Sequence, residues 1–319
     1  MTAPGFDQVP ACWVCGGTAF VAVHEAVFEL SIYAQQDPEL AAYSGAHVTL
    51  QRCRACGFAQ PAALPSLPGF FDRMYDQRWA DDWIAGEHDA GYKDWIFADI
   101  LAALKRRFTD GRGRALLDVG AHAGRFLRLA REAGWDGEGL ELNPKTAAYA
   151  AQASGAVVHQ GNIHTFTPAR CYDAVTLTDV LEHVPRPLEV LARVHAFLCS
   201  GGWLAIKVPN GPSQRVKETL RARLRPSYRA TLADNLVHVN HFSAASLARA
   251  LTAAGFHDVT VLAAAPELPE DPARARLSLS KWLGAGRLGR LAAYHVARAL
   301  PGGAASPLAF NLQAYGRRD

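Results

Sequence analysis

Four cysteines near the start of the 319-residue chain are spaced as metal ligands often are. Two residues separate Cys12 from Cys15, two separate Cys53 from Cys56, and a glycine follows each pair. Such spacing lets both sulfurs of a turn face one ion, and the glycine allows the positive φ that the turn needs. Four thiolates in a tetrahedron suit Zn²⁺ and leave no open position, so the pattern predicts a structural zinc site. Two unrelated surface pairs or two disulfides are the alternatives.

The two remaining cysteines, Cys171 and Cys199, lie in apolar sequence without a neighbouring cysteine. Unpaired cysteine behaves as a small hydrophobic residue. We therefore expect both to be small residues of the core.

A second group of residues that could do chemistry lies at 116–127, which reads LLDVGAHAGRFL. An apolar run ends at Asp118, Gly120 and Gly124 follow with His122 between them, and an amphipathic stretch then begins. The spacing differs from the G-x-G-x-x-G of dinucleotide sites. A bare backbone at Gly120 would let a ligand lie close to the main chain. The pattern therefore predicts a small-molecule cradle at the end of a strand.

From residue 114 onward, segments with strand character alternate with segments of helical periodicity. Such alternation is typical of an α/β fold whose mostly parallel sheet has helices on both faces. The expected strands are 114–119, 137–142, 156–162, 172–178, 203–209, 256–264 and 307–317. The expected helices are 124–134, 144–154, 187–202 and 243–255, with Ser243 as the N-cap of the last and Gly255 as its C-cap.

The chain divides into three parts by composition. We expect a zinc-binding module at 1–61, a linker and helical lid at 62–112, and the α/β domain at 113–319 with insertions at 211–242 and 266–306. Six aromatic residues in the middle part form either a face that packs on the core or a lid over a ligand: Tyr75, Trp79, Trp83, Tyr92, Trp95 and Phe97. The basic amphipathic stretch 279–300 is expected to pack on its own domain, with docking to a membrane or lipid as the alternative.

The segment from Asp118 to Gly124 resembles motif I of class I S-adenosylmethionine (SAM)-dependent methyltransferases, with His122 where a glycine is common. Glu141, 23 residues after Asp118, and the later sequence LEHV match the family's order of motifs. The resemblance implies a Rossmann-like, doubly wound sheet of seven strands whose last strand is antiparallel. It also implies a cofactor site formed by Asp118, Gly120, His122, Gly124, Glu141, Leu142, Asn162, Ile163, Thr178 and Asp179.

The resemblance also implies roles for particular side chains. Asp118 would accept hydrogen bonds from the cofactor ammonium, and Glu141 would accept both ribose hydroxyls. Asn162 stands where the family often has an aspartate beside the adenine. His122 would point away from the cofactor or hydrogen-bond its carboxylate.

An N-terminal pair of CxxC motifs before a methyltransferase core is similar to zinc-containing sugar C-methyltransferases and to relatives found with glycan or natural-product biosynthesis. Those sugar enzymes carry Tyr-x-Glu-His near the substrate, whereas this chain has His238-Val239-Asn240-His241, of which only the last residue matches. The resemblance therefore implies the architecture, and more weakly a small-molecule acceptor such as a sugar, nucleotide-sugar or secondary metabolite.

Methyl transfer to an acceptor that carries a proton at neutral pH needs a base, and imidazole has a suitable pKa. His241 is the first candidate for this base, with His238 and His183 as alternatives. A carboxylate or thiolate acceptor would need no base.

Two other functions remain open from the sequence: an RNA methyltransferase that holds nucleic acid with its zinc module, and a non-catalytic SAM-binding partner protein. Residues 1–60 contain only Arg52 and Arg54 as basic side chains, and the formal net charge is +3. This charge distribution argues against nucleic acid as the ligand.

The N-terminal sequence has no basic segment followed by an apolar one, and no run of 18 apolar residues without a charge occurs in the chain. We therefore expect a cytoplasmic protein without a transmembrane segment. The sequence is compatible with a homodimer.

Overall fold

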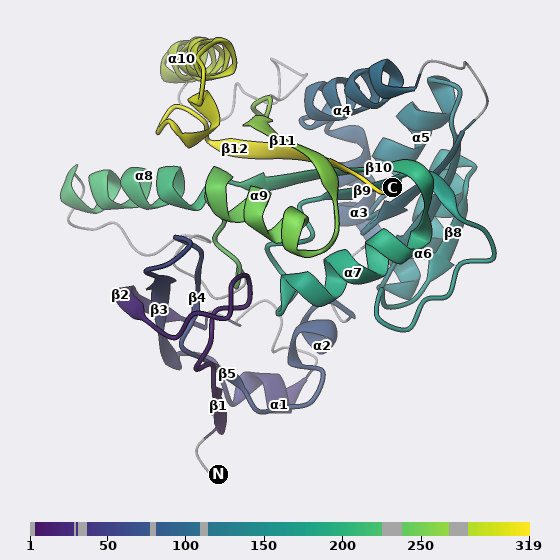
Figure 1. Cartoon of the computed structure of the whole chain (residues 1–319). Helices are drawn as coiled ribbons and strands as arrows, with labels where there is room; N and C mark the ends of the chain where they lie inside the picture. The colour runs from purple at the N-terminus through teal and green to yellow at the C-terminus, as the bar shows by residue number, and fades with distance from the viewer. Residues whose placement is uncertain are drawn as a thin grey trace.

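The computed structural model describes residues 4–28, 30, 37–76, 81–108, 114–224, 238–267 and 280–319. An N-terminal module precedes an α/β domain (Figure 1). The strands of the module are β1 (Phe6–Gln8), β2 (Phe20–Val27), β3 (His47–Cys53), β4 (Ala59–Pro61) and β5 (Ala63–Pro65), and its helix is α1 (Pro38–Ala41). β2, β3 and β4 form an antiparallel sheet, and β1 pairs with β5.

The α/β domain is built on a seven-stranded sheet, which confirms the predicted fold. Its order is β11-β12-β10-β9-β6-β7-β8. β6 pairs in parallel with both β7 and β9, whereas β12 is antiparallel to β10 and β11. The strands are β6 (Ala115–Val119), β7 (Asp136–Glu141), β8 (Val157–Gln160), β9 (Tyr172–Thr178), β10 (Leu198–Pro209), β11 (His257–Ala263) and β12 (Asn311–Arg317).

Helices cover both faces of this sheet, and each face has its own apolar core. Residues of α4 and α5 pack with Leu116 and Tyr315 on one face, and residues of α7 and α9 pack with Leu117 and Ile206 on the other. The helices are α2 (Phe70–Asp76), α3 (Asp81–Asp89), α4 (Asp94–Arg107), α5 (Arg125–Glu132), α6 (Pro144–Ser154), α7 (Pro187–Phe197), α8 (Gly211–Leu224), α9 (Ala244–Ala253) and α10 (Ser280–Ala299).

The helix expected at 187–202 is shorter than predicted. α7 ends at Phe197, because Leu198 is already extended (φ −75°, ψ 147°) and begins β10. The glycines that we expected to end the helix therefore lie within β10, which shifts register between Leu198 and Trp203. α9 has the predicted N-cap at Ser243, but its C-cap is Ala254, and Gly255 follows with φ +90°.

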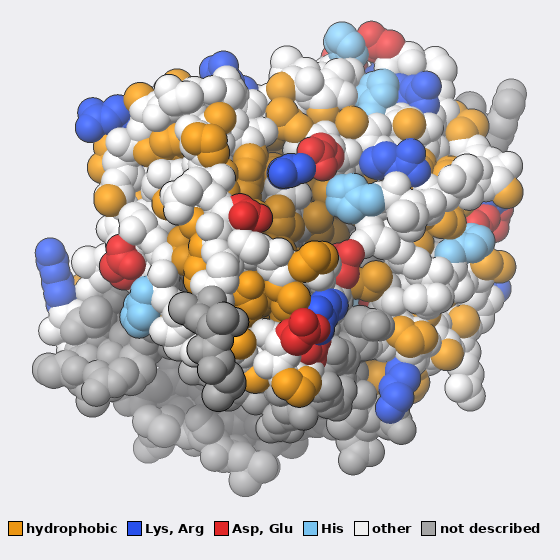
Figure 2. Space-filling model, turned by 90° about the horizontal axis from the view of Figure 1, so that it is seen from below, with side chains coloured by type: hydrophobic (Ala, Val, Ile, Leu, Met, Phe, Trp, Pro, Cys, Tyr) orange, Lys and Arg blue, Asp and Glu red, His pale blue; other side chains and the backbone are white. Residues whose placement is uncertain are grey.

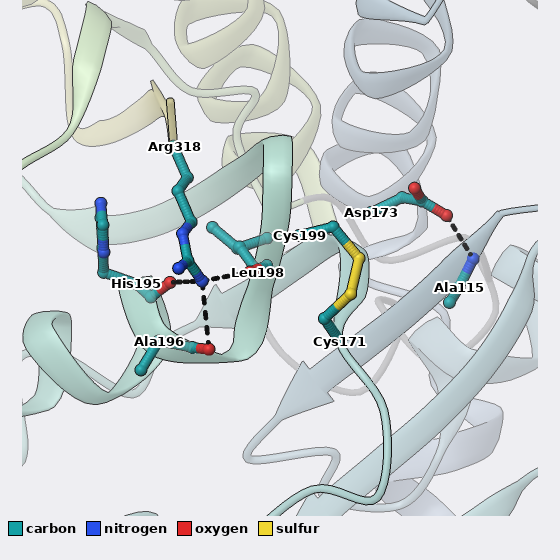
Figure 3. Close-up of a disulfide and its surroundings, with 8 residues drawn as sticks. All are labelled: Ala115, Cys171, Asp173, His195, Ala196, Leu198, Cys199 and Arg318. Carbon is teal, nitrogen blue, oxygen red and sulfur yellow. Dashed lines mark hydrogen bonds between the residues drawn. A yellow bond between two sulfur atoms is a disulfide. The ribbon is translucent and has the colours of Figure 1, made fainter.

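The prediction that Cys171 and Cys199 are separate core residues was wrong. The two form a disulfide with 5.0 Å between their Cα atoms, and Cys171 is exposed (Figure 3). The bond joins the segment before β9 to the start of β10. Close by, the guanidinium of Arg318 donates hydrogen bonds to the carbonyls of His195, Ala196 and Leu198 and so holds the end of α7.

The two insertions are only partly described. Residues 225–237 and 268–279 lie outside the described residues. In the described part of the second insertion, Tyr294 and Ala297 of α10 are buried against the domain, as expected for a helix that packs on its own domain. Within the part of the chain that the structure describes, no helix combines the length and the apolar character needed to cross a membrane.

Candidate active site

The glycine turn between β6 and α5 requires glycine for two separate reasons. Gly120 and Gly124 have φ of +74° and +76°, in the left-handed region. A Cβ on Gly120 would lie 2.4 Å from Val180 Cγ2, and one on Gly124 would lie 2.8 Å from the carbonyl oxygen of Ala150. His122 also adopts a positive φ (+49°), so it takes the backbone conformation of the glycine that it replaces.

Glu141 closes this turn from the end of β7. Its Oε2 accepts a hydrogen bond from the His122 amide (2.8 Å), and its Oε1 accepts one from the Asn143 amide (3.0 Å). Asn143 in turn caps α6. Burial raises the pKa of Glu141, although the backbone hydrogen bonds oppose that rise. The carboxylate is thus held in place by main-chain donors before any ligand arrives.

Asp118 lies buried at the end of β6 and accepts a hydrogen bond from the Thr176 hydroxyl (2.6 Å). Burial raises its pKa to about 7, and the nearby Glu141 adds to the rise while Thr176 opposes it. A carboxyl group in this state is well suited to pair with a cationic ligand group, because such a group would favour its ionised form.

One cavity of about 710 Å³ lies at this edge of the sheet. Figure 2 views the molecule from the side of the N-terminal module and shows a hollow with hydrophobic side chains in its depth and charged side chains and histidines at its rim. Of the predicted cofactor residues, all but Gly124 line the cavity: Asp118, Gly120, His122, Glu141, Leu142, Asn162, Ile163, Thr178 and Asp179. Gly124 instead packs on α6 through its contact with Ala150.

Helix α2 lies along the cavity and contacts one predicted cofactor residue and one candidate base. Asp72 accepts a hydrogen bond from Asn162 Nδ2 (2.7 Å), and the Tyr75 hydroxyl lies 2.7 Å from His183 Nδ1. Asp72 and Tyr75 both line the cavity. Nothing in the sequence singled out Asp72, because an exposed acid on a short helix carries no motif.

The aromatic residues at 75–97 divide between the two roles that the sequence left open. Tyr75, Tyr92 and Phe97 line the cavity, whereas the ring of Trp95 packs on Tyr294 of α10 (5.2 Å between ring centroids). Trp79 and the side chain of Trp83 lie outside the described residues.

A buried ionic network lies beside the cavity, at the end of β9. Asp179, which has a φ of +56°, pairs with Lys93 at 2.7 Å and with Lys207, whose side chain is only 1% exposed. Burial alone would raise the pKa of Asp179, but the two lysines outweigh it and hold that pKa well below its usual range. Lys207 also pairs with Glu267 at 3.1 Å. The sequence did not reveal either lysine as a site residue.

Two of the three candidate bases meet in the cavity. His183 and His238 both line it, with their rings 4.6 Å apart at an interplanar angle of 70°. Nitrogens of both rings lie within 4.8 Å of a carboxylate oxygen of Glu182. Burial raises the pKa of Glu182 well above its usual value, with Asp179 as a further cause, and burial lowers the pKa of His238 well below its usual value.

The structure does not bring His241 to this cluster. His241 is buried, and its backbone forms an isolated antiparallel bridge with Ala59 of the N-terminal module. It is not among the residues that line the cavity. Burial, with Arg215 as the next cause, lowers its pKa to about 3, which makes it a weak base.

The four cysteines of the N-terminal module do come together. The sulfurs of Cys12 and Cys56 are 3.6 Å apart, those of Cys15 and Cys53 are 3.5 Å apart, and all four lie within 4.8 Å of one another. Four thiolates around one Zn²⁺ at about 2.3 Å would have similar separations. The donor set therefore fits a tetrahedral ion.

Comparisons with known proteins agree with this geometry. The family model for the methyltransferase domain matches residues 92–261, just over half of the chain. Trans-aconitate 2-methyltransferase of Streptomyces avermitilis is 33% identical over 210 residues, which cover 61% of this chain and 71% of that protein. Ubiquinone biosynthesis O-methyltransferase of Bordetella avium is 32% identical over 106 residues, which cover 31% of this chain and 44% of that protein.

Among solved structures, one chain in the complex between the Haloferax volcanii Trm112 methyltransferase activator and a methyltransferase has a TM-score of 0.51. It is 19% identical, and the alignment covers 74% of this chain and 96% of that one, so it shares the fold. Together with the family match and the cavity at the carboxyl edge of the sheet, these findings establish that the chain belongs to the methyltransferase domain family and is a SAM-dependent methyltransferase.

Proposed function

We propose that the protein transfers the methyl group of SAM to a small-molecule acceptor of the sugar, nucleotide-sugar or secondary-metabolite type. One observation carries this proposal: a single cavity has the glycine turn and Glu141 among its lining residues, together with Tyr75, His183 and His238. The first group suits the cofactor, and the second suits an acceptor that must lose a proton.

The cofactor supplies a methyl group on a sulfonium, which is activated for in-line displacement. The protein residues must hold the acceptor atom roughly 3–3.5 Å from that methyl carbon, because such positioning contributes up to about 7–11 kcal/mol. Glu141 and Asp118, with the bare backbone at Gly120, would hold the cofactor at one end of the cavity. The polar side chains near His183 would orient the acceptor at the other end.

We assign the role of base to His183 rather than to His238 or His241. His183 lines the cavity, and a hydrogen bond to Tyr75 orients its ring. His238 is a poorer base because burial lowers its pKa, and His241 lies outside the cavity lining. A positioned base of this kind typically contributes about 10²–10⁴-fold to the rate.

Two further observations support a small acceptor. The names of both curated relatives refer to small molecules, trans-aconitate in one and the ubiquinone pathway in the other. The N-terminal module carries only two basic residues within positions 1–60, which does not favour a polyanion such as RNA.

The first experiment is calorimetric titration of the purified protein with S-adenosylhomocysteine (SAH). We expect micromolar binding. Glu141→Ala should weaken it about 100-fold, because the two ribose hydroxyls would lose their hydrogen bonds to a charged carboxylate. Glu132→Ala, which changes an exposed acid on α5, is the control and should bind as the wild type does. Binding would justify an acceptor screen that begins with nucleotide sugars, whereas well-folded protein that binds no SAH would refute the proposal.

We also propose that the four cysteines bind one structural Zn²⁺. Elemental analysis should find one zinc per chain, and Cys53→Ser should lose both the metal and soluble expression, because metal binding and folding of such sites are coupled. Cys171→Ser breaks the disulfide instead and should keep the zinc. A stable, zinc-free Cys53→Ser protein that retains the wild-type melting temperature would contradict the assignment.

A further inference from the structure

We propose that the N-terminal module positions His183 through two separate connections, one to its ring and one to its loop. This inference rests on the role of His183 proposed above. The module would thus support the end of the cavity proposed for the acceptor. Tyr75 and Asn240 are assigned as positioning residues.

The first connection fixes the imidazole ring. The Tyr75 hydroxyl lies 2.7 Å from His183 Nδ1, and the two rings meet edge to face with centroids 5.4 Å apart. For Nε2 to accept a proton, Nδ1 must carry the ring hydrogen and donate it to the Tyr75 oxygen. A hydroxyl can accept from Nδ1 or donate to it, and we assign the first arrangement to this pair, which leaves Nε2 free to accept a proton.

Tyr75 is held by the module because helix α2 is anchored there. Phe70 and Met74 of this helix are buried in one apolar cluster with Phe28 and Tyr43 of the module, and the Phe70 ring meets both aromatic rings edge to face. The neighbouring Arg73 donates two hydrogen bonds, each 2.8 Å long, to the carboxylate of Asp37, which also caps α1. The position of the Tyr75 hydroxyl is thus set by module residues distant in sequence.

The second connection fixes the loop on which His183 lies. Asn240 is buried, and its Nδ2 donates to the carbonyls of Leu181 (2.6 Å) and Val184 (2.7 Å), on either side of His183. The amides of Val239 and Asn240 both donate to the carbonyl of Glu182. Four hydrogen bonds to three carbonyls therefore hold this loop to one short segment.

That segment is in turn bound to the cysteine turn of the module. The amide and carbonyl of His241 pair with the carbonyl and amide of Ala59 at 2.9 and 3.2 Å. The rings of Phe242 and Phe58 are both fully buried and 5.0 Å apart. The Phe58 carbonyl accepts from the Cys53 amide within the metal-binding turn. A continuous path of buried contacts thus leads from a predicted zinc ligand to the His183 loop.

The ring connection is tested by Tyr75→Phe, which removes one oxygen and keeps the ring. Nitrogen-15 NMR of histidine-labelled full-length protein should show the Nδ1-protonated tautomer of His183 in the wild type and a mixture of tautomers in the variant. Tyr149→Phe is the control, because Tyr149 lies on α6 away from the cavity lining and should change nothing. An unchanged His183 tautomer in Tyr75→Phe would overturn this half of the proposal.

The loop connection is tested by Asn240→Ala against a closely matched control. Asn210 is equally buried, and its Nδ2 also donates to two carbonyls, but these belong to Ala304 and Ala309, far along the chain from the His183 loop. In hydrogen exchange followed by mass spectrometry, Asn240→Ala should speed exchange in peptides covering 179–186 by about tenfold or more. The loop loses the two hydrogen bonds from the Asn240 side chain, so it opens to solvent more often. Asn210→Ala should leave those peptides unchanged, and equal exchange in both variants would overturn the proposal.

Activity measurements then separate this inference from the proposed function. Once an acceptor is known, Tyr75→Phe should lower kcat about 10-fold or more at an unchanged KM for SAM, because it acts on the transition state. Full activity in His183→Asn would refute the base assignment, even where the NMR and exchange results stand. If His183→Asn loses activity but Tyr75→Phe keeps the wild-type kcat, only the positioning role of Tyr75 is refuted.

Discussion

The two ends of the cavity are built in different ways. The cofactor end that we propose uses Asp118, Gly120, Glu141 and Asn162, which lie at or just after the ends of three strands that are close in sequence and adjacent in the sheet. The acceptor end that we propose gathers α2, the segment before α4, the loop after β9 and His238 from across the chain. The first end follows from a local rule of parallel sheets, whereas the second depends on long-range packing.

The chemistry of the two ends differs in the same way. At the cofactor end, main-chain groups do much of the work, as in the amides of His122 and Asn143 that hold Glu141. At the acceptor end, side chains from distant segments contact one another, as Tyr75 contacts His183 and Lys93 contacts Asp179. Backbone geometry at one end and side-chain packing at the other should therefore respond to different substitutions.

The largest effect is expected from a side chain at Gly124. In Gly124→Ala, the new methyl group would meet the Ala150 backbone at 2.8 Å and the residue would keep a φ of +76°, so we expect a loss of about 3 kcal/mol or more in the free energy of unfolding. Urea denaturation would measure it. SAH affinity should fall as well, because the turn depends on the close packing of α5 on α6.

Gly134→Ala is the matched control for this prediction. Gly134 has a φ of +89°, but a Cβ there would meet no atom within 4 Å. We expect a loss of only about 1 kcal/mol, from backbone strain alone, and wild-type SAH affinity. Equal losses of unfolding free energy in the two variants would show that the contact with the Ala150 backbone adds nothing at Gly124. That result would contradict the steric explanation.

The same contrast explains what could be predicted from the sequence. The strands along the chain and the meeting of the motif residues in one cavity were predictable, because each motif sits at a strand end and strand ends meet at one edge. His241 was the first candidate base, yet it lies in the bridge to Ala59, which forms between segments about 180 residues apart. No local pattern encodes that bridge, so the sequence could not show which of the histidines reach the cavity.

The disulfide and the end of α7 were missed for related physical reasons. Spacing in the sequence identified Cys12 with Cys15 because both lie on one turn, but Cys171 and Cys199 are brought together by the pairing of Tyr172 in β9 with Leu198 in β10. The helical periodicity of 187–202 continued past Phe197, but pairing in the sheet overrode it.

An intermediate effect is expected from pH at the cofactor end. Because burial raises the pKa of Asp118 to about 7, the folded protein binds a proton that the unfolded chain releases near pH 4. The stability contributed by this group is therefore present below about pH 4 and lost as the pH rises toward 7. A cofactor ammonium needs the ionised form, so SAH affinity should rise about tenfold between pH 5.5 and 7.

Calorimetry in buffers of different ionisation enthalpy would detect the proton released on binding near pH 6. Asp118→Asn keeps an oxygen for the Thr176 hydroxyl and removes the titration, so its SAH affinity should be weaker and nearly flat over this range. A slope that persists in Asp118→Asn would assign the proton to another group, with Glu141 as the next candidate because its pKa is also raised.

The smallest effect is expected at His122, where a side chain occupies a glycine position. In His122→Gly, relief of the left-handed backbone (φ +49°) favours folding by about 1–2 kcal/mol, and the greater freedom of the unfolded glycine offsets about 0.5–1 kcal/mol of it. The variant should thus be more stable by between about 0 and 1.5 kcal/mol. SAH affinity should change less than about threefold, because the group that holds Glu141 is the His122 amide, which glycine retains. His122→Asn, which tolerates a positive φ, should give nearly wild-type stability. A large loss of SAH affinity in both variants would mean that the imidazole itself contacts the cofactor, and the cofactor end would then depend on side chains as the acceptor end does.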